Sequence, residues 1–283
     1  MNTTGIVIIS RPANPATRPY LIIADHDKLV TYELYRDAPL SITVDKSTKY
    51  CTGWYDISTH TNYPCERLKS IGDSHISCFS CRKKTDFNPA FYNASQVSET
   101  QTTYNNMPHT VYIAYFGSGS AKAGIMSDSR GKERLYEQGA LLYAIVSTCP
   151  NATAAHKLEA ALIGQGLKNS MTKKQKAAAY QNIIDLKQET DSFRSILYGL
   201  GHKGEIVSNL DMFFFGKYIN EQIEAFENTQ ISGNVIGVIG RYLVLKNNDR
   251  YYGFWLSDIF GYKTTFDTQI TLLDRKPQQA RLF

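Results

Sequence analysis

The chain has 283 residues, with 31 basic and 26 acidic side chains and a formal net charge of +5. Hydrophobic residues make up 42% and charged residues 20%, a composition that excludes wholesale disorder. The length favours about two domains. Because acidic and basic residues nearly balance, net charge alone does not indicate a nucleic-acid partner.

The apolar stretches of the sequence are short. The longest lie at residues 5–9 and 139–149, well below the roughly 20 residues that a membrane-spanning helix needs. No basic residue precedes Arg11 and no long apolar core follows it, so we expect no secretory signal. The sequence therefore predicts a cytoplasmic protein with no membrane partner.

Residues 1–48 form a predicted N-terminal β segment. Runs of β-branched and aromatic residues, bounded by proline and turn residues, predict four strands. They lie at residues 5–9, 20–23, 29–34 and 40–44.

Residues 49–106 carry four of the five cysteines: Cys51, Cys65, Cys78 and Cys81. An odd cysteine count without a predicted secretory signal indicates a reducing compartment, where such a cluster more often binds metal than forms disulfides. Four thiolates close a tetrahedral shell around Zn²⁺ and leave no open position for substrate. The sequence therefore predicts a structural zinc site.

Two alternatives remain for this cluster. His60 or His75, in the same window, can replace one thiolate, or the four cysteines can be unrelated buried residues. The rest of the segment shows little helical periodicity, and the polar residues 96–109 are interpreted as a linker.

Residues 107–230 begin with a predicted hairpin and continue with predicted helices. The hairpin has strands at 111–116 and 122–125 around a Gly-Ser-Gly-Ser turn. A helix is predicted over 132–138, with Asp128 or Ser129 near its cap, and a buried strand over 141–146. Two further predicted helices run from Asn151 or Thr153 to Leu167 and, with a break, from Thr172 to about Tyr198.

The C-terminal segment, residues 231–283, is predicted as a small β domain. Its strands are expected at 233–240, 241–245, 251–255 and 262–266. The glycines of the first strand predict bends in a small barrel; no helix follows them, as a dinucleotide-binding loop would require. We expect the two terminal β segments to pack together, because the chain ends of domains often lie close.

The run from Val111 to Ile163 resembles the GIY-YIG nuclease domain, which has a three-stranded antiparallel sheet flanked by helices. Thr110-Val-Tyr112 lies where the first motif triplet occurs, and Lys122-Ala-Gly124 lies at the second. Some branches of that superfamily have Lys-Ile-Gly or Lys-Val-Gly at the second triplet. Arg134 opens a helix after the hairpin, and Glu159 lies where the superfamily holds its metal-binding glutamate.

The wider layout, from about Cys51 to Gly261, resembles an uncharacterised bacterial domain family of unknown function. That family has a cysteine cluster before a Val-Tyr-Leu-Ala strand, and then several short motifs in a fixed order. The matching runs are Val111-Tyr-Ile-Ala114, Lys122-Ala-Gly124, Arg134-Leu135, Gln138-Gly-Ala140 and Gly240-Arg-Tyr-Leu243.

The first resemblance implies roles for three residues in phosphodiester hydrolysis. Tyr112 would act near the attacking water, Arg134 would steady the phosphate, and Glu159 would hold Mg²⁺ or Mn²⁺. A single carboxylate suits Mg²⁺, which keeps several waters, and the planar arginine fork matches two phosphate oxygens. An alternative for Arg134 is a surface ion pair with Glu133 or Glu137.

The second triplet departs from the superfamily pattern. We place Ala123 at the position of the motif tyrosine, and strand alternation then predicts that Lys122 points to the opposite face. Lys122 remains a catalytic candidate if the hairpin is twisted or bulged there. His156, three residues before Glu159, is a candidate catalytic partner or a surface residue.

Three further residues are predicted to contact substrate. Gln138 could orient it, and Lys173 and Lys174 begin a basic helix that could contact phosphates, although a solvated helix face is the alternative.

Taken together, the sequence predicts an α+β protein. A GIY-YIG-like core would lie beside a zinc-stapled segment and a small β-rich terminal domain. The implied function is a metal-dependent nuclease on DNA or RNA. One alternative is a non-catalytic nucleic-acid-binding module, which could use the zinc segment and the 34 aromatic side chains. Another is an enzyme of a different class that uses the same cleft for a small-molecule substrate.

Overall fold

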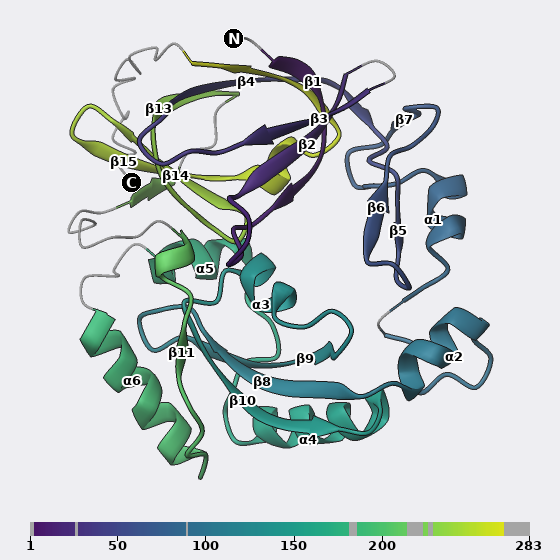
Figure 1. Ribbon diagram of the computed structural model, residues 1–283, viewed down its shortest axis with the longest axis vertical. Helices are drawn as coiled ribbons and strands as arrows, with labels where there is room; N and C mark the ends of the chain where they lie inside the picture. The colour runs from purple at the N-terminus through teal and green to yellow at the C-terminus, as the bar shows by residue number, and fades with distance from the viewer. Residues whose placement is uncertain are drawn as a thin grey trace, which may run out of the picture.

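The computed structural model describes residues 3–25, 28–88, 90–180, 186–213, 223–225 and 229–268. These residues form a ten-stranded sheet, a four-stranded sheet and a two-stranded ribbon, together with helices (Figure 1). The predicted α+β class is confirmed. None of the described helices is long and apolar enough to span a membrane.

The ten-stranded sheet is built from both ends of the chain. Its order is β12-β15-β14-β13-β4-β16-β1-β2-β3, with β7 also paired to β4. The expectation that the terminal β segments pack together is confirmed, because β1 pairs with β16 and β4 pairs with both β13 and β16. The bounds are β1 (Thr3–Arg11), β2 (Tyr20–Asp25), β3 (Lys28–Glu33), β4 (Pro39–Tyr50), β7 (Ser70–Ile71), β12 (Ile223–Ala225), β13 (Gln230–Ile239), β14 (Tyr242–Asn247), β15 (Arg250–Trp255) and β16 (Tyr262–Asp267).

This sheet curls around its own apolar core (Figure 1). Val7, Ile42 and Phe266, from three neighbouring strands, are fully buried in it. The pairing of β13 with β14 shifts register between Val235 and Gly237, which places a bend where the glycine pattern predicted one. A short helix, η2 (Leu256–Ile259), follows β15.

The four-stranded sheet has the order β11-β10-β8-β9, and the hairpin β8–β9 is the predicted one. All seven residues of the central strand β8 are buried, which explains its continuous apolar run. Asn151 caps α4, because its side chain accepts a hydrogen bond from Ala154 N at 2.9 Å. The bounds are β8 (His109–Tyr115), β9 (Ala121–Ser127), β10 (Leu142–Cys149), β11 (Val207–Ser208), α3 (Glu133–Gln138), α4 (Ala152–Gly164), α5 (Lys173–Tyr180), α6 (Leu186–Gly199) and η1 (Asp211–Phe213).

The helices differ from the predicted pattern at the start of α3 and between α5 and α6. Lys132 lies at the N-cap of α3 without a side-chain cap hydrogen bond, and Asp128 and Ser129 precede it in the same loop. The Asp128 carboxylate accepts a hydrogen bond from Thr110 Oγ1 at 2.7 Å and does not cap the helix. The predicted break between α5 and α6 falls on residues 181–185, which lie outside the described residues.

The cysteine-bearing segment contains β5 (Trp54–Asp56), β6 (Thr61–Tyr63), α1 (Phe79–Thr85) and α2 (Glu99–Asn106). The interpretation of residues 96–109 as a linker is therefore wrong. The Ser98 side chain caps α2 by accepting a hydrogen bond from Gln101 N at 3.2 Å. Gln101 is almost fully buried, and its side-chain oxygen accepts from Asn88 N at 2.9 Å. Ser-x-x-Gln is a helix-start pattern, but the helix buries polar rather than apolar contacts and so lacks a periodic signal.

The two larger sheets meet where the β13–β14 turn approaches the end of α3. Gly240 has a φ of +61°, and a Cβ on it would lie 2.7 Å from both Glu137 O and Gly139 N. On α5, Tyr180 donates a hydrogen bond to Gly139 O at 2.8 Å, which fixes the backbone at the end of α3. Two of the short motifs noted in the sequence, Gln138-Gly-Ala140 and Gly240-Arg-Tyr-Leu243, are therefore neighbours in space.

Candidate active site and metal centre

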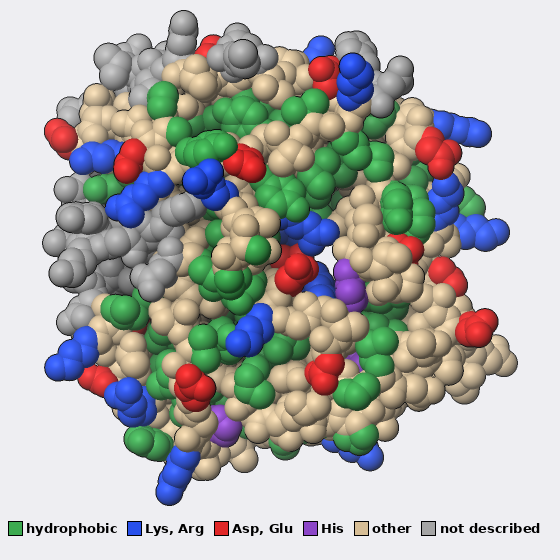
Figure 2. All heavy atoms as spheres, in the orientation of Figure 1, with side chains coloured by type: hydrophobic (Ala, Val, Ile, Leu, Met, Phe, Trp, Pro, Cys, Tyr) green, Lys and Arg blue, Asp and Glu red, His purple; other side chains and the backbone are tan. Residues whose placement is uncertain are grey.

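A cavity of about 570 Å³ lies where the curled sheet, the cysteine-bearing segment and the four-stranded sheet meet. Figure 2 shows a hollow near the centre of the molecule, where basic, acidic and histidine side chains gather. The cavity is lined by aromatic, charged and histidine side chains and by one glycine, among them Arg11, Tyr55, Tyr92, Tyr112, Lys122, Gly124, Arg130, Arg134, Glu137, His156, Glu159 and Arg241.

The strand register decides which residues of the hairpin face this cavity. Tyr112 lies opposite Gly124, and Ala114 lies opposite Lys122. Because residues two apart on a strand share a face, Lys122 and Gly124 lie on the same side as Tyr112. The expectation that Lys122 faces away from the site is therefore wrong. Ala123 is the residue on the other face, where it is fully buried in the core.

Gly124 allows the Tyr112 ring to lie flat across β9. A Cβ at Gly124 would be 2.6 Å from both Cζ and the hydroxyl oxygen of Tyr112. The Gln138 side chain, from the end of α3, donates a hydrogen bond to this hydroxyl. Burial raises the pKa of Tyr112, with Arg134 opposing, so the phenol keeps its proton near neutral pH.

Lys122 and Glu159 contribute the remaining charges on this side of the cavity. Burial, reinforced by the positive charge of Arg134, lowers the pKa of Lys122 to about 8, with Glu159 opposing. Glu159 lies on α4, and its Oε2 is 3.0 Å from Nδ1 of His156. The ring of Tyr92 stacks on His156 at a centroid distance of 3.7 Å. The predicted proximity of His156 and Glu159 is thus present.

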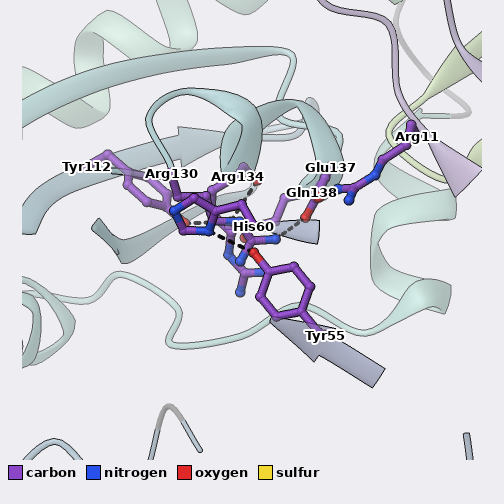
Figure 3. A network of polar contacts seen from close by, with 8 residues as sticks. All are labelled: Arg11, Tyr55, His60, Tyr112, Arg130, Arg134, Glu137 and Gln138. Atoms are coloured by element: carbon purple, nitrogen blue, oxygen red, sulfur yellow. Dashed lines mark hydrogen bonds and ion pairs between the residues drawn. The ribbon is translucent and has the colours of Figure 1, made fainter. Parts of the chain in front are cut away.

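A second group of charges centres on Glu137 (Figure 3). This carboxylate is buried, and one oxygen accepts a hydrogen bond from Arg11 Nη1 at 2.9 Å. The other oxygen accepts from Arg130 Nη2. Glu137 therefore joins the curled sheet to the four-stranded sheet, and it is not the surface partner of Arg134 that the sequence allowed.

The cysteine-bearing segment reaches the same network from a third direction. The hydroxyl of Tyr55 lies 2.9 Å from Nδ1 of His60, and Nε2 of His60 lies 3.1 Å from Ser129 Oγ. The guanidinium of Arg130 lies 5.9 Å from the Tyr55 ring centroid, within reach of a cation–π contact. Both ring nitrogens of His60 are thereby engaged by Tyr55 and Ser129, and His60 is not part of the cysteine group.

The structure places the three predicted substrate contacts differently. Gln138 contacts Tyr112, as described above, whereas Lys173 and Lys174 are exposed on α5 and do not line the cavity. Lys173 forms an ion pair with Asp258. Their contact with substrate stays a prediction. Lys176, on the same helix, instead turns inward and donates a hydrogen bond to Gln138 O at 2.7 Å.

The four cysteines form a group that can hold a metal ion. The Sγ atoms of Cys51, Cys65, Cys78 and Cys81 lie within 4.8 Å of one another, and all four residues are buried. Backbone N–H groups of Gly53 and Cys78 donate to the Cys51 sulfur at 3.3 and 3.1 Å. A tetrahedral site with Zn–S bonds of about 2.3 Å needs such a cluster, so the donor set fits structural zinc.

Both alternatives for the cysteines are excluded by this arrangement. The four cysteines are not unrelated buried residues, since they share one cluster. His60 is bound to Tyr55, and His75 is exposed and outside the group. Cys149, the fifth cysteine, is buried in the core of the four-stranded sheet.

Sequence reasoning did not single out Arg11, Arg130, Glu137 and Arg241 as site residues. They come from β1, the loop before α3, α3 itself and the β13–β14 turn. No local spacing connects them. The one available signal was the Gly240-Arg-Tyr-Leu243 motif, which contains Arg241.

Fold and site together define an α+β protein that combines a cysteine cluster able to hold a metal ion with a cationic cavity. The profile of a family described as "Protein of unknown function (DUF2797)" matches residues 78–252, more than half of the chain. The chain belongs to this family, which agrees with the predicted membership of an uncharacterised family of unknown function. No curated protein matches the chain, and no solved structure does.

Proposed function

We propose that this protein is a metal-dependent phosphodiester hydrolase that acts on DNA or RNA through a GIY-YIG-like site. One observation carries the proposal. Tyr112, Lys122, Arg134 and Glu159, taken from short motifs on four elements, all line one cavity. Residues selected only for their order along the chain would not be expected to converge unless the motifs share a purpose.

The arrangement of elements supports the same conclusion. The strands β10, β8 and β9 form an antiparallel sheet, with β8 in the centre. The hairpin β8–β9 is followed by α3, which carries Arg134, and then by α4, which carries Glu159. This is the order that the GIY-YIG resemblance implies, with β11 added at the edge beside β10.

The charges of the cavity fit phosphodiester hydrolysis, which needs a divalent cation and neutralisation of the phosphate. Among the described residues, the cysteine cluster is the only group of three or more potential metal ligands. A cation at Glu159 would therefore be held by one carboxylate, the substrate and water, which suits Mg²⁺ or Mn²⁺. Arg134 would contact the phosphate oxygens.

The pKa values suggest how the proton moves. The raised pKa of Tyr112 makes this hydroxyl a hydrogen-bond donor near neutral pH. Lys122, with a pKa of about 8, is partly a free amine near neutral pH and can accept a proton from the attacking water. Lys122 therefore takes the role of base, and Tyr112 orients the water or a phosphate oxygen.

The surface of the cysteine-bearing segment supports a nucleic-acid substrate. Arg82, Lys83 and Lys84 lie in the last turn of α1, and Phe79 at its start is 74% exposed. Basic residues suit phosphates, and an exposed aromatic ring suits base stacking. The charged cavity also favours a phosphorylated substrate over the alternative of an uncharged small molecule.

The test is a cleavage assay with Mg²⁺ or Mn²⁺ on single-stranded, double-stranded and branched DNA and on RNA. Wild type is compared with Glu159→Gln and with Glu205→Gln, an exposed carboxylate outside the cavity. We expect Glu159→Gln to lose cleavage at least 100-fold and Glu205→Gln to retain it. Cleavage that survives Glu159→Gln contradicts the proposal. Salt-sensitive binding without cleavage of any substrate would favour the non-catalytic module.

A further inference from the structure

The cavity carries more positive charge than one phosphodiester can neutralise. Its lining includes five cationic side chains, Arg11, Arg130, Arg134, Arg241 and Lys122, but only two carboxylates, Glu137 and Glu159. A divalent cation at Glu159 would add two more positive charges, whereas a scissile diester supplies one negative charge. Buried charge of one sign is costly unless it is paired, so the substrate should bring further negative charge.

Within the described residues, Arg241 forms no ion pair with a carboxylate, and neither do Arg134 and Lys122. Both oxygens of Glu137 are engaged, one by Arg11 and the other by Arg130. The Nε of Arg241 is buried and has no hydrogen-bond partner in the part of the chain that the structure describes. The guanidinium lies 5.6 Å from the Phe260 ring centroid, a contact that positions it without neutralising it.

The backbone holds Arg241 firmly at the cavity wall. It follows Gly240, whose close approach to Glu137 and Gly139 ties the β13–β14 turn to α3. Arg241 also lies within electrostatic range of Glu137, whose charge Arg11 and Arg130 already share, and of the cations Arg134, Arg11 and Arg130. Arg134 in turn is close enough to influence Lys122 and Tyr112. Positive charge therefore continues from the proposed catalytic group to the turn of the curled sheet.

We propose that Arg241 is the centre of a second phosphate subsite, supported by Arg11, that binds a phosphate of the substrate strand other than the one cleaved. This inference rests on the proposed function and extends it. Because Arg241 comes from the curled sheet and Glu159 from α4, a strand bound at both subsites would span the junction of the two sheets. The phosphate can be a terminal one or an internal one of the same strand.

Binding can be measured without cleavage by isothermal titration calorimetry in Ca²⁺. The probes are single-stranded tetranucleotides that carry a 5′-phosphate, a 3′-phosphate or hydroxyls at both ends. The variants are Arg241→Gln, Arg241→Lys, which keeps the charge, and Arg194→Gln, an exposed arginine of α6 paired with Asp191. A thermal melt of each variant reports whether it is folded.

We expect Arg241→Gln to weaken binding at least tenfold, Arg241→Lys less than threefold, and Arg194→Gln not at all. A tenfold loss confined to one phosphorylated probe identifies a terminal phosphate, and an equal loss for all three identifies an internal one. The subsite proposal is wrong if Arg241→Gln is folded and binds every probe with the affinity of wild type. It is also wrong if Arg241→Lys loses as much affinity as Arg241→Gln, because charge would then not matter.

The two proposals fail separately. Binding that depends on Arg241, without any cleavage that depends on Glu159, supports the phosphate subsite and contradicts the hydrolase proposal. Cleavage that depends on Glu159, with binding that does not change in Arg241→Gln, supports the hydrolase and contradicts the phosphate subsite.

Discussion

At the scale of single residues, the site depends on which side chains of one hairpin share a face. Gly124 leaves room for the Tyr112 ring, and Lys122 lies on the same face two residues away. With Ala123 at the position of the motif tyrosine, strand alternation predicts that Lys122 faces away. The register shows that the first residue of the triplet, not the middle one, lies on the side of Tyr112.

The pKa of Lys122 predicts the pH dependence of the reaction. Its value is lowered from 10.5 to about 8, so the ammonium form, which cannot accept a proton, predominates below that pH. We expect kcat/KM to rise with pH and to level off above about pH 8. Lys122→Met should abolish the rise and lower the rate about 100-fold. Lys28→Met, on the exposed edge strand β3, is the matched control. An unchanged profile in Lys122→Met would contradict this role.

At the scale of elements, the cysteine-bearing segment supplies one wall of the cavity through Tyr55. Besides four cysteines, the segment supplies Tyr55 and His60, and His60 reaches Ser129 beside α3. Structural zinc contributes about 10–16 kcal/mol in small zinc domains, so its loss should unfold the segment. The cavity would then lose a wall although no cysteine lines it.

Cys81→Ser tests this coupling. We expect wild type to hold one zinc ion per chain by elemental analysis, and the variant to lose it, to become protease-sensitive between residues 51 and 81, and to lose cleavage. Cys149→Ser, at a buried cysteine outside the cluster, should keep its zinc. Full zinc content in Cys81→Ser would show that this residue is not a ligand.

At the scale of the whole molecule, Glu137 joins the two larger sheets through Arg11 and Arg130. Glu137→Gln removes the negative charge that both arginines share and leaves only one acceptor oxygen for the two of them. Because these arginines are partly exposed, we expect a loss of about 2–3 kcal/mol in the free energy of unfolding in urea, below the 3–5 kcal/mol of fully buried pairs. Glu66→Gln breaks the exposed pair with Lys84 and should cost less than about 0.5 kcal/mol. Equal losses in the two variants would contradict the proposed role of Glu137.

Much of the fold could be predicted because it follows from local patterns. β-branched runs located the strands at both chain ends, and Asn151 marked the start of α4. The helix α2 was missed because Ser98 and Gln101 stabilise it through polar contacts without an apolar stripe. The cluster of four cysteines could be predicted from their spacing, because cysteines grouped in this way are typical of metal sites.

The rest of the site could not be predicted, because it arises from contacts between distant segments. Arg11 and Glu137 are 126 residues apart, and Arg241 reaches the cavity only because Gly240 packs on α3. A lone arginine in a β segment has no spacing that distinguishes it from a surface residue. Such contacts become visible only when both sheets are assembled around one cavity.

The central claim is that Tyr112, Lys122, Arg134 and Glu159 form one metal-dependent site. The most direct test is a crystal structure of the full chain with Mn²⁺ and a short phosphorothioate single strand, recorded at the manganese absorption edge. We predict an anomalous manganese peak bound to Glu159, with the bridging phosphate within hydrogen-bond distance of Arg134. No manganese at Glu159, at concentrations that support cleavage, would contradict the account.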